Sequence, residues 1–177
     1  FLALPHGVSH NYVKNFYNKI NIFDLSADFR LDSSEIYENI YDNKHSCPQY
    51  LNSFVYGLTE INKNEIIKSK NISIPGCYPT SILLPLIPLL KKNIIKVNNI
   101  IIDSKSGYSG AGKNFNIDKI KKSEDFNFYN YSTNTHRHIC EIQQELNRYT
   151  SNDVKSMWII FSDEIGSIDI VHHLLIF

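Results

Sequence analysis

The fold class is decided by residues 1–25, which read FLALPHGVSHNYVKNFYNKINIFDL. Phe1–Leu4 is apolar like the end of a buried strand, and Pro5–Gly7 marks the turn after it. Ser9 can cap a helix that extends to about residue 20, and Ile22–Leu25 has the character of a second buried strand. Because strands that alternate with crossover helices form parallel sheets, we predict an α/β fold.

Polar turns follow both of these strands. Pro5-His6-Gly7 comes after the first strand, and Ser26-Ala27-Asp28-Phe29-Arg30 comes after the second. The carboxyl ends of parallel strands lie at one edge of the sheet, where the ligands of such folds bind. We therefore expect a ligand site at this edge.

The rest of the chain is predicted to continue this pattern and to end in an antiparallel or mixed sheet. The expected strands are 72–74, 97–103, 157–161 and 168–177. The expected helical segments are a turn at 62–68, a helix from Cys77 that Pro85 and Pro88 kink or shorten, and a helix over 139–149. Residues 33–54 are expected to be loop with short helix, and residues 114–134 to be a surface loop.

The composition gives no basis for a nucleic-acid or membrane partner. The 177 residues are 42% hydrophobic and 20% charged, and the formal net charge is zero. The longest apolar run, Ile82–Leu90, is too short to span a bilayer. Three cysteines without a CxxC pair are typical of reduced thiols, so we expect a cytoplasmic location.

Cys77 stands in a setting that suits a nucleophile. It occurs in Ser73-Ile74-Pro75-Gly76-Cys77-Tyr78-Pro79-Thr80-Ser81, between a predicted strand and a long apolar segment. Pro75 and Gly76 favour a tight turn, and Pro79 is compatible with the first turn of a helix. Free N–H groups and the helix dipole at such a position favour the thiolate, which is the reactive form of cysteine. A buried, unreactive thiol is the alternative.

A glycine-rich loop and a histidine cluster could complete the site. Ser106–Gly112 places three glycines and two serines in seven residues, so backbone N–H groups can approach phosphate or carboxylate oxygens; a plain surface loop is the alternative. His136-Arg137-His138 with Glu141 supplies a base, a guanidinium for an oxyanion and an orienting carboxylate; polar caps of the next helix are the alternative. A zinc site of His136, His138 and Cys140 lacks a fourth ligand, so we expect no metal.

Together, these motifs resemble N-acetyl-gamma-glutamyl-phosphate reductase, an enzyme family of arginine biosynthesis. The resembling strings follow the order and spacing of that family over roughly residues 1–147: Ala3-Leu4-Pro5-His6-Gly7, Asp24–Arg30, Tyr56-Gly57-Leu58, Pro75–Thr80, Asp103–Gly112, and His136-Arg137-His138 with Glu141. The resemblance implies part of a Rossmann-like NAD(P)-binding domain in residues 1–74. It implies an α+β catalytic and dimerisation domain of the semialdehyde dehydrogenase type, with a mixed sheet, in residues 75–177. It also implies a portion of the enzyme without the amino-terminal glycine-rich unit and without a recognisable carboxyl terminus.

The resemblance further implies a reaction and a role for each motif. NADPH-dependent reduction would convert N-acetylglutamyl 5-phosphate to N-acetylglutamate 5-semialdehyde and phosphate through a thioester on Cys77. His138 would be the acid/base, oriented by Glu141. Substrate would be bound by His136, Arg137 and Arg30. The NADP(H) site would be lined by Pro5, His6, Gly7, Ser106, Gly107, Ser109, Gly110, Ala111 and Gly112.

Two alternatives stay open at this point. One is an enzyme of the aspartate-semialdehyde dehydrogenase type, which uses the same thioester chemistry. The other is an inactive fragment or degraded gene product of the reductase. The expected partners are a small-molecule acyl phosphate and further copies of the chain, as a dimer or tetramer, with no nucleic acid and no membrane.

Overall fold

The computed structural model describes residues 1–96, 100–107, 127–130, 132, 135–150, 157–165 and 173–176. The chain divides into two compact units, each described by itself below. Unit 1 comprises Phe1–Thr80 and Cys140–Glu145. Unit 2 comprises Ser81–Ile139 and Leu146–Phe177.

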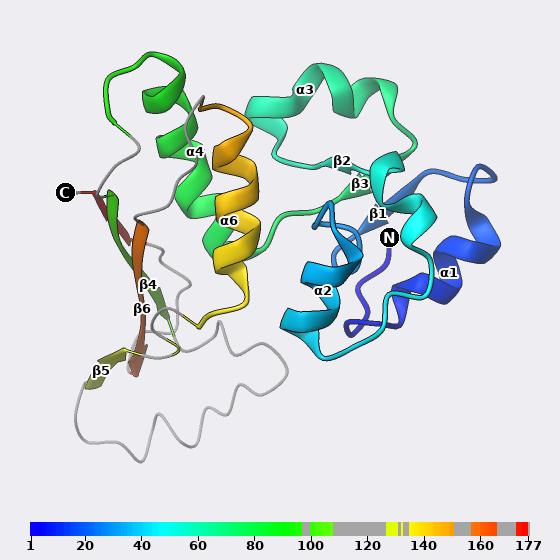
Figure 1. Ribbon diagram of the computed structural model, residues 1–177, viewed down its shortest axis with the longest axis horizontal. Coiled ribbons are helices and arrows are strands. Elements are labelled where there is room, and N and C mark those ends of the chain that lie inside the picture. Colours follow the sequence, from blue (N-terminus) through cyan, green and yellow to red (C-terminus); the bar gives the residue numbers. More distant parts are fainter. Residues whose placement is uncertain are drawn as a thin grey trace. The chain divides into compact units, whose positions relative to one another are not determined.

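Unit 1 is built on a parallel three-stranded sheet, as the strand and helix alternation predicts. Its strands, in spatial order, are β1 (Ile22–Asp24), β3 (Asn71–Ser73) and β2 (Val55–Tyr56). Its complete helices are α1 (Ser9–Phe16), α2 (Ser34–Tyr41) and α3 (Thr59–Lys68), and a 3₁₀ helix, η1, covers Pro48–Ser53. In Figure 1 the three strands lie between α2 and α3. The predicted short helices within residues 33–54 and 62–68 are thus confirmed, with slightly different ends.

An apolar cluster holds the helices of unit 1 to the sheet. Its buried members are Val13, Ile22, Phe29, Cys47 and Leu51. They come from α1, β1, the turn after β1 and the segment at η1. Burying a large apolar side chain contributes about 1.5–3 kcal/mol, so this cluster fixes α1 and η1 against β1.

Three expectations for the first residues are wrong in detail. Phe1–Leu4 forms a single parallel bridge, between Leu2 and Asp24, and not a strand. The helix α1 has no side-chain cap, because the Ser9 hydroxyl instead donates to Oδ1 of Asp24 at 2.8 Å. It also ends well before residue 20, because Asn18 takes a φ of 62°, which a helix cannot contain.

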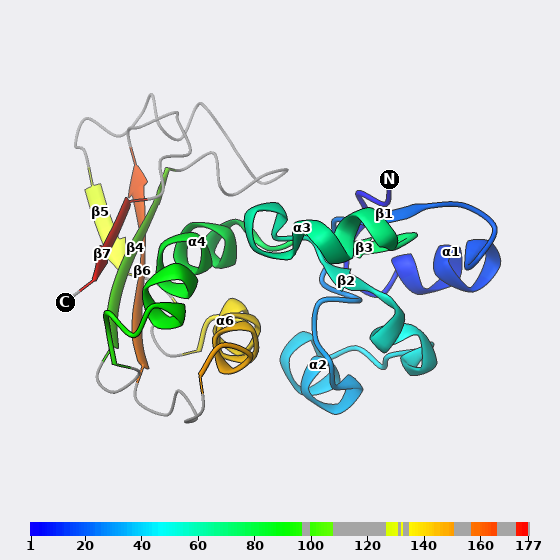
Figure 2. The same cartoon turned by 90° about the horizontal axis from the view of Figure 1, so that it is seen from above.

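Unit 2 contains the mixed sheet that the sequence predicts. Its strands, in spatial order, are β5 (Asn127–Asn130), β6 (Met157–Ile165), β4 (Ile100–Gly107) and β7 (His173–Ile176). The pair β4–β6 is parallel, whereas β4–β7 and β5–β6 are antiparallel. The helix α4 (Cys77–Lys91), which enters this unit at Ser81, lies along one face of the sheet in Figure 2.

The structure corrects two expectations for unit 2. The helix α4 continues through Pro85 and Pro88 to Lys91. Each proline removes one backbone hydrogen bond, but the apolar side chains that the intact helix buries outweigh this loss: Ile82, Leu83, Leu86, Ile87 and Leu90. The strand β5 lies within the expected surface loop, because its backbone pairs with β6.

The remaining elements agree with prediction where they are described. The helix α6 (His138–Asn147) matches the expected helix over 139–149. Residues 97–99 of one expected strand and 168–172 of another lie outside the described residues. None of the helices in the described part of the chain combines the length and hydropathy needed to cross a bilayer.

Gly7 is the position in unit 1 where glycine is required most clearly. Its φ is 83°, and its N–H donates to Oδ1 of Asp28 at 2.8 Å. A Cβ at Gly7 would lie 1.9 Å from Nδ2 of Asn43.

We expect Gly7→Ala to lower the free energy of unfolding by about 1–3 kcal/mol, measured by urea denaturation, because the left-handed conformation is strained for alanine. Asn11→Ala, at an exposed position of α1, is the matched control and should change it by less than about 0.5 kcal/mol. Equal stability of the two variants would contradict this account.

Candidate active site

The segments that follow the three parallel strands meet at one edge of the sheet in unit 1. The Ile74 N–H donates to the Asp24 carbonyl at 2.7 Å, which ties the segment after β3 to the end of β1. The Gly57 N–H donates to the Ser73 carbonyl at 2.8 Å, which ties the segment after β2 to the end of β3. This edge therefore gathers Arg30, Gly57 and Cys77 in unit 1.

Cys77 is exposed and is the first residue of α4, as the motif predicts. The residue before it is held on both sides. The Gly76 N–H donates to Oε1 of Glu141 at 3.0 Å, and the Gly76 carbonyl accepts from the Thr80 N–H at 3.0 Å and from its hydroxyl at 2.8 Å. The thiol is thus presented from a fixed backbone.

Glu141 is the anchor of this turn. Its side chain is buried, with 1% exposed, and Oε1 also accepts a hydrogen bond of 2.7 Å from the Tyr56 hydroxyl. Its Oε2 lies 3.5 Å from Nη1 of Arg30. Removing one partner of such a buried pair costs about 3–5 kcal/mol, because the other charge is left uncompensated. The local sequence pattern pairs Glu141 with His138 and does not predict these contacts.

Arg30 is buried and also stabilises the turn before Cys77. Its Nε donates to the Ile74 carbonyl at 2.7 Å, and Nη2 donates to the Leu25 carbonyl at 2.9 Å. With Glu141 as third partner, the guanidinium links the segments after β1 and β3. Substrate binding by Arg30 remains a prediction, whereas its positioning of the Cys77 turn is a direct consequence of these contacts.

The surroundings of Cys77 shift its pKa in both directions. Although the residue is exposed, nearby protein removes enough water from the sulfur to raise the pKa of the thiol above its ordinary value, and this effect is the largest. The N–H groups of Tyr78 and Cys77 and the charge of Arg30 lower the pKa, while the charge of Glu141 raises it. The helix start therefore favours the thiolate as predicted, but desolvation prevails. The other two thiols are less accessible, and burial raises the pKa of Cys47 to about 11.

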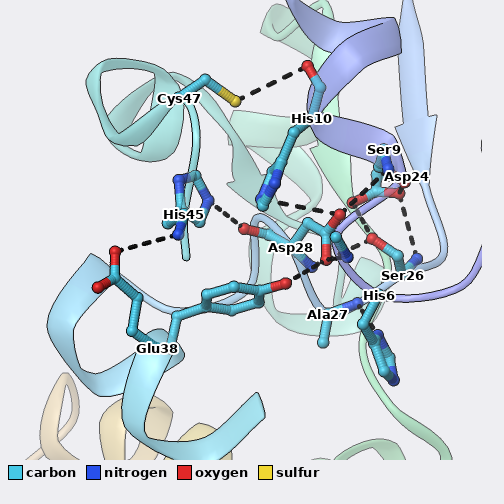
Figure 3. A network of polar contacts seen from close by, with 12 residues as sticks. His6, Ser9, His10, Asp24, Ser26, Ala27, Asp28, Glu38, His45 and Cys47 are labelled. Carbon is cyan, nitrogen blue, oxygen red and sulfur yellow. Dashed lines mark hydrogen bonds and ion pairs between the residues drawn. The ribbon is translucent and has the colours of Figure 1, made fainter. Parts of the chain in front are cut away.

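Asp28, in the segment after β1, holds the Pro5–Gly7 turn against the parallel sheet of unit 1 (Figure 3). The Asp28 carboxylate is fully buried and accepts hydrogen bonds from the Gly7 N–H and from the Tyr37 hydroxyl at 2.7 Å. Nδ1 of His6 accepts from the Ala27 N–H at 3.1 Å, which fixes the imidazole beside Asp28. Pro5, His6 and Gly7 therefore lie in a rigid turn after the Leu2 bridge.

This rigid turn fits a nicotinamide cofactor. Such cofactors bind in the crevice outside the carboxyl ends of parallel strands, and the Pro5–Gly7 turn is held to the segment after β1 at that edge.

The predicted histidine cluster is divided between the units: His136, Arg137 and His138 belong to unit 2, whereas Glu141 belongs to unit 1. His138 is buried, its N–H donates to Nδ1 of His136 at 3.2 Å, and Arg137 is exposed. The His136 ring lies against Phe161, with centroids 4.2 Å apart. Burial, with a smaller contribution from the positive charge of Arg137, lowers the pKa of His136 to about 4, so this imidazole is neutral near pH 7.

The glycine-rich loop is only partly described. Ser106 and Gly107 end β4 and are buried in unit 2. The other predicted residues of this loop, Ser109, Gly110, Ala111 and Gly112, lie outside the described residues.

The residues that support the two turns are not predictable from local sequence patterns. Tyr56 and Gly76 lie within motifs that were recognised, yet their contacts with Glu141 join positions 85 and 65 residues apart. Asp28 also lies in a recognised motif. Its acidic side chain between Ala27 and Phe29 is the one feature of the sequence that could have indicated a role in holding the turn. Local sequence patterns do not predict partners that lie so far apart along the chain.

Comparison with known proteins agrees with the geometry of both units. Residues 1–69 match the family described as the semialdehyde dehydrogenase NAD-binding domain, and residues 77–163 match the semialdehyde dehydrogenase dimerisation domain. A protein of Ehrlichia canis (strain Jake), named N-acetyl-gamma-glutamyl-phosphate reductase, is 49% identical over 146 residues, which are 82% of this chain and 42% of that protein.

Proteins from other organisms are similar to the chain as well. A protein of the same name from Alkaliphilus metalliredigens (strain QYMF) is 50% identical over 147 residues, which are 82% of this chain and 42% of that protein. A protein of Oryza sativa subsp. japonica, named as a probable chloroplastic form, is 43% identical over 154 residues, which are 87% of this chain and 37% of that protein. These relatives confirm the resemblance seen in the motifs. The chain spans less than half the length of the relatives it matches.

The charges around Cys77 predict how its reactivity depends on pH. Alkylation by iodoacetamide, followed at Cys77 by peptide mass, should have a midpoint above the ordinary thiol pKa. Glu141→Gln should lower the midpoint, because it removes a negative charge, and Arg30→Gln should raise it. The matched control is Glu145→Gln, which alters another buried carboxylate of α6 and should leave the midpoint unchanged. A higher midpoint in Glu141→Gln, or a lower midpoint in Arg30→Gln, would contradict the assignment.

Proposed function

This chain belongs to the semialdehyde dehydrogenase family, and on that premise we propose that it is the part of an N-acetyl-gamma-glutamyl-phosphate reductase that carries the reactive cysteine. The observation that supports this proposal most is the exposed Cys77 at the first position of α4, behind a Gly76 held by Glu141 and Thr80. We also propose a domain boundary after residue 74. Residues 1–74 then belong to the cofactor-binding domain, and residues 75–177 belong to the catalytic and dimerisation domain.

The first step is acyl transfer to Cys77. The Cys77 thiolate attacks the acyl carbon of N-acetylglutamyl 5-phosphate, the C–O bond to phosphate breaks, and inorganic phosphate leaves with the electron pair. A thioester forms on Sγ of Cys77. The positive charge of Arg30 and the first N–H groups of α4 favour the thiolate against the desolvation that opposes it.

The second step reduces the thioester. NADPH, when bound, supplies hydride to the thioester carbonyl. Cys77 then holds the thiohemiacetal, whose C–S bond breaks to release the semialdehyde and regenerate the thiolate. By the family pattern we assign the proton transfers of both steps to His138, with Glu141 orienting it and with His136 and Arg137 binding substrate.

The cofactor and the assembly belong to the proposal too. Residues 1–69 match an NAD-binding domain, and we propose that the cofactor is NADP(H) bound by the Pro5–Gly7 turn and the Ser106–Gly112 loop. The match to a dimerisation domain supports a homo-oligomer, and a cytoplasmic location suits a small-molecule biosynthetic enzyme.

Activity of the completed enzyme tests the role of Cys77. The chain can be completed with the amino-terminal and carboxyl-terminal segments of its Ehrlichia canis relative, and NADPH oxidation can be followed with N-acetylglutamyl 5-phosphate. We expect Cys77→Ser to lower kcat by at least about 10³-fold, because a serine hydroxyl is not ionised near neutral pH. Cys140→Ser is the matched control, since this thiol is half-buried on α6, and it should retain activity.

Two outcomes would contradict the proposal. Equal rates for wild type and Cys77→Ser would exclude the thioester mechanism. A clear preference for aspartyl phosphate over N-acetylglutamyl 5-phosphate would place the chain with the aspartate-type enzymes instead.

A further inference from the structure

Three potential metal ligands meet inside unit 1, away from the Cys77 turn. They are His10 in α1, His45 in the segment between α2 and η1, and Cys47 just before η1. One ligand atom from each lies within 4.8 Å of the others, and all three residues are buried. Figure 3 shows the two imidazoles and the Cys47 sulfur gathered above Asp28.

The tautomer of His45 follows from its hydrogen bond. Nε2 of His45 lies 2.7 Å from the Asp28 carbonyl oxygen, and a carbonyl only accepts, so Nε2 carries the hydrogen. Burial lowers the pKa of His45, which keeps the ring neutral. Nδ1 therefore has a free lone pair, and it is buried without a hydrogen-bond partner. A backbone carbonyl that accepts from the other ring nitrogen is the usual support of a metal-binding histidine.

His10 offers a second buried imidazole nitrogen. Nε2 of His10 is buried and has no hydrogen-bond partner. Burial is the main effect on this ring and lowers its pKa, so it too is neutral near pH 7. The ring centroids of His10 and His45 are 4.2 Å apart. Edge-on packing against Phe29 and Tyr37 explains why these rings are buried, but it leaves Nδ1 of His45 and Nε2 of His10 without hydrogen-bond partners.

Cys47 and Asp28 supply the negative charge that a cation would need. Sγ of Cys47 makes only a long contact of 3.9 Å to the His10 carbonyl oxygen. The Asp28 carboxylate Oδ2 lies 3.7 Å from Nε2 of His10. One thiolate and one carboxylate would balance a divalent cation, so the loaded site would bury no net charge.

We propose that His10, His45 and Cys47 bind one zinc ion, which ties α1 to the segment that precedes η1. Two imidazoles and a thiolate are a donor set that zinc prefers. Zinc bonds of about 2.0–2.3 Å require the three side chains to close by about 1 Å on binding. The Cys47 thiol loses its proton to solvent as the Zn–S bond forms, so each zinc bound releases one proton.

Cobalt titration tests the site with Cys47 as the sole thiol. The full chain carrying Cys77→Ser and Cys140→Ser is freed of metal with a chelator and then titrated with Co²⁺. We expect one cobalt per chain, a thiolate-to-cobalt charge-transfer band in the near ultraviolet, and loss of the band when one equivalent of Zn²⁺ is added. Absence of the band at saturating cobalt would overturn the proposal.

Single substitutions in that background assign the ligands. His45→Asn and Cys47→Ser should each weaken Co²⁺ binding by at least about 100-fold. The matched control is His136→Asn, which removes a half-buried histidine of unit 2 and should leave binding unchanged. Binding that persists with unchanged affinity in Cys47→Ser would show metal held elsewhere and would overturn the proposal.

A measurement on the wild-type chain covers the case in which a variant fails to fold. The rate of Cys47 alkylation, located by peptide mass, is measured with and without one equivalent of Zn²⁺ after treatment with chelator. We expect zinc to slow alkylation of Cys47 at least about tenfold, because the metal occupies the sulfur lone pair. An unchanged rate would contradict zinc binding at this cysteine.

Discussion

A buried carboxylate needs hydrogen-bond donors or a positive charge, and Glu141 receives both from distant parts of the sequence. The Tyr56 hydroxyl and the Gly76 N–H share one oxygen, and Arg30 lies beside the other. Burial and the charge of Glu141 raise the pKa of Tyr56 far above its ordinary value, so its hydroxyl remains a donor. Because Arg30 follows β1, Tyr56 ends β2 and Gly76 follows β3, the carboxylate fixes the edge of the sheet from which Cys77 projects. The position of the thiol therefore depends on Glu141.

Asp28 is a second buried carboxylate with hydrogen-bond donors around it, and it holds the Pro5–Gly7 turn. Backbone N–H groups of Gly7 and Ser9 and the Tyr37 hydroxyl donate to its carboxylate, and its carbonyl accepts from His45. Asp28 thus joins the proposed cofactor turn to the proposed zinc ligands. The two sites of unit 1 share this buried residue, so a zinc ion near His10 would also stiffen the turn.

The sequence predicted the elements of this fold better than the contacts between them. The alternation of strands and helices and the setting of Cys77 are local patterns, and both lead to the observed parallel sheet and helix start. The shortening considered at Pro85 and Pro88 does not occur, because the burial of apolar side chains of α4 outweighs two lost backbone bonds. The partners of Glu141 could not be predicted, since each lies more than 60 residues away along the chain and is selected by packing.

The central claim is that Cys77 accepts an acyl group from an acyl phosphate, and the covalent adduct tests it most directly. The chain is mixed with N-acetylglutamyl 5-phosphate without NADPH, and the modified peptide is identified by mass. The account predicts one N-acetylglutamyl group per chain, on Cys77, that hydroxylamine removes as it does a thioester. No adduct on Cys77, or the same adduct in Cys77→Ser, would contradict it.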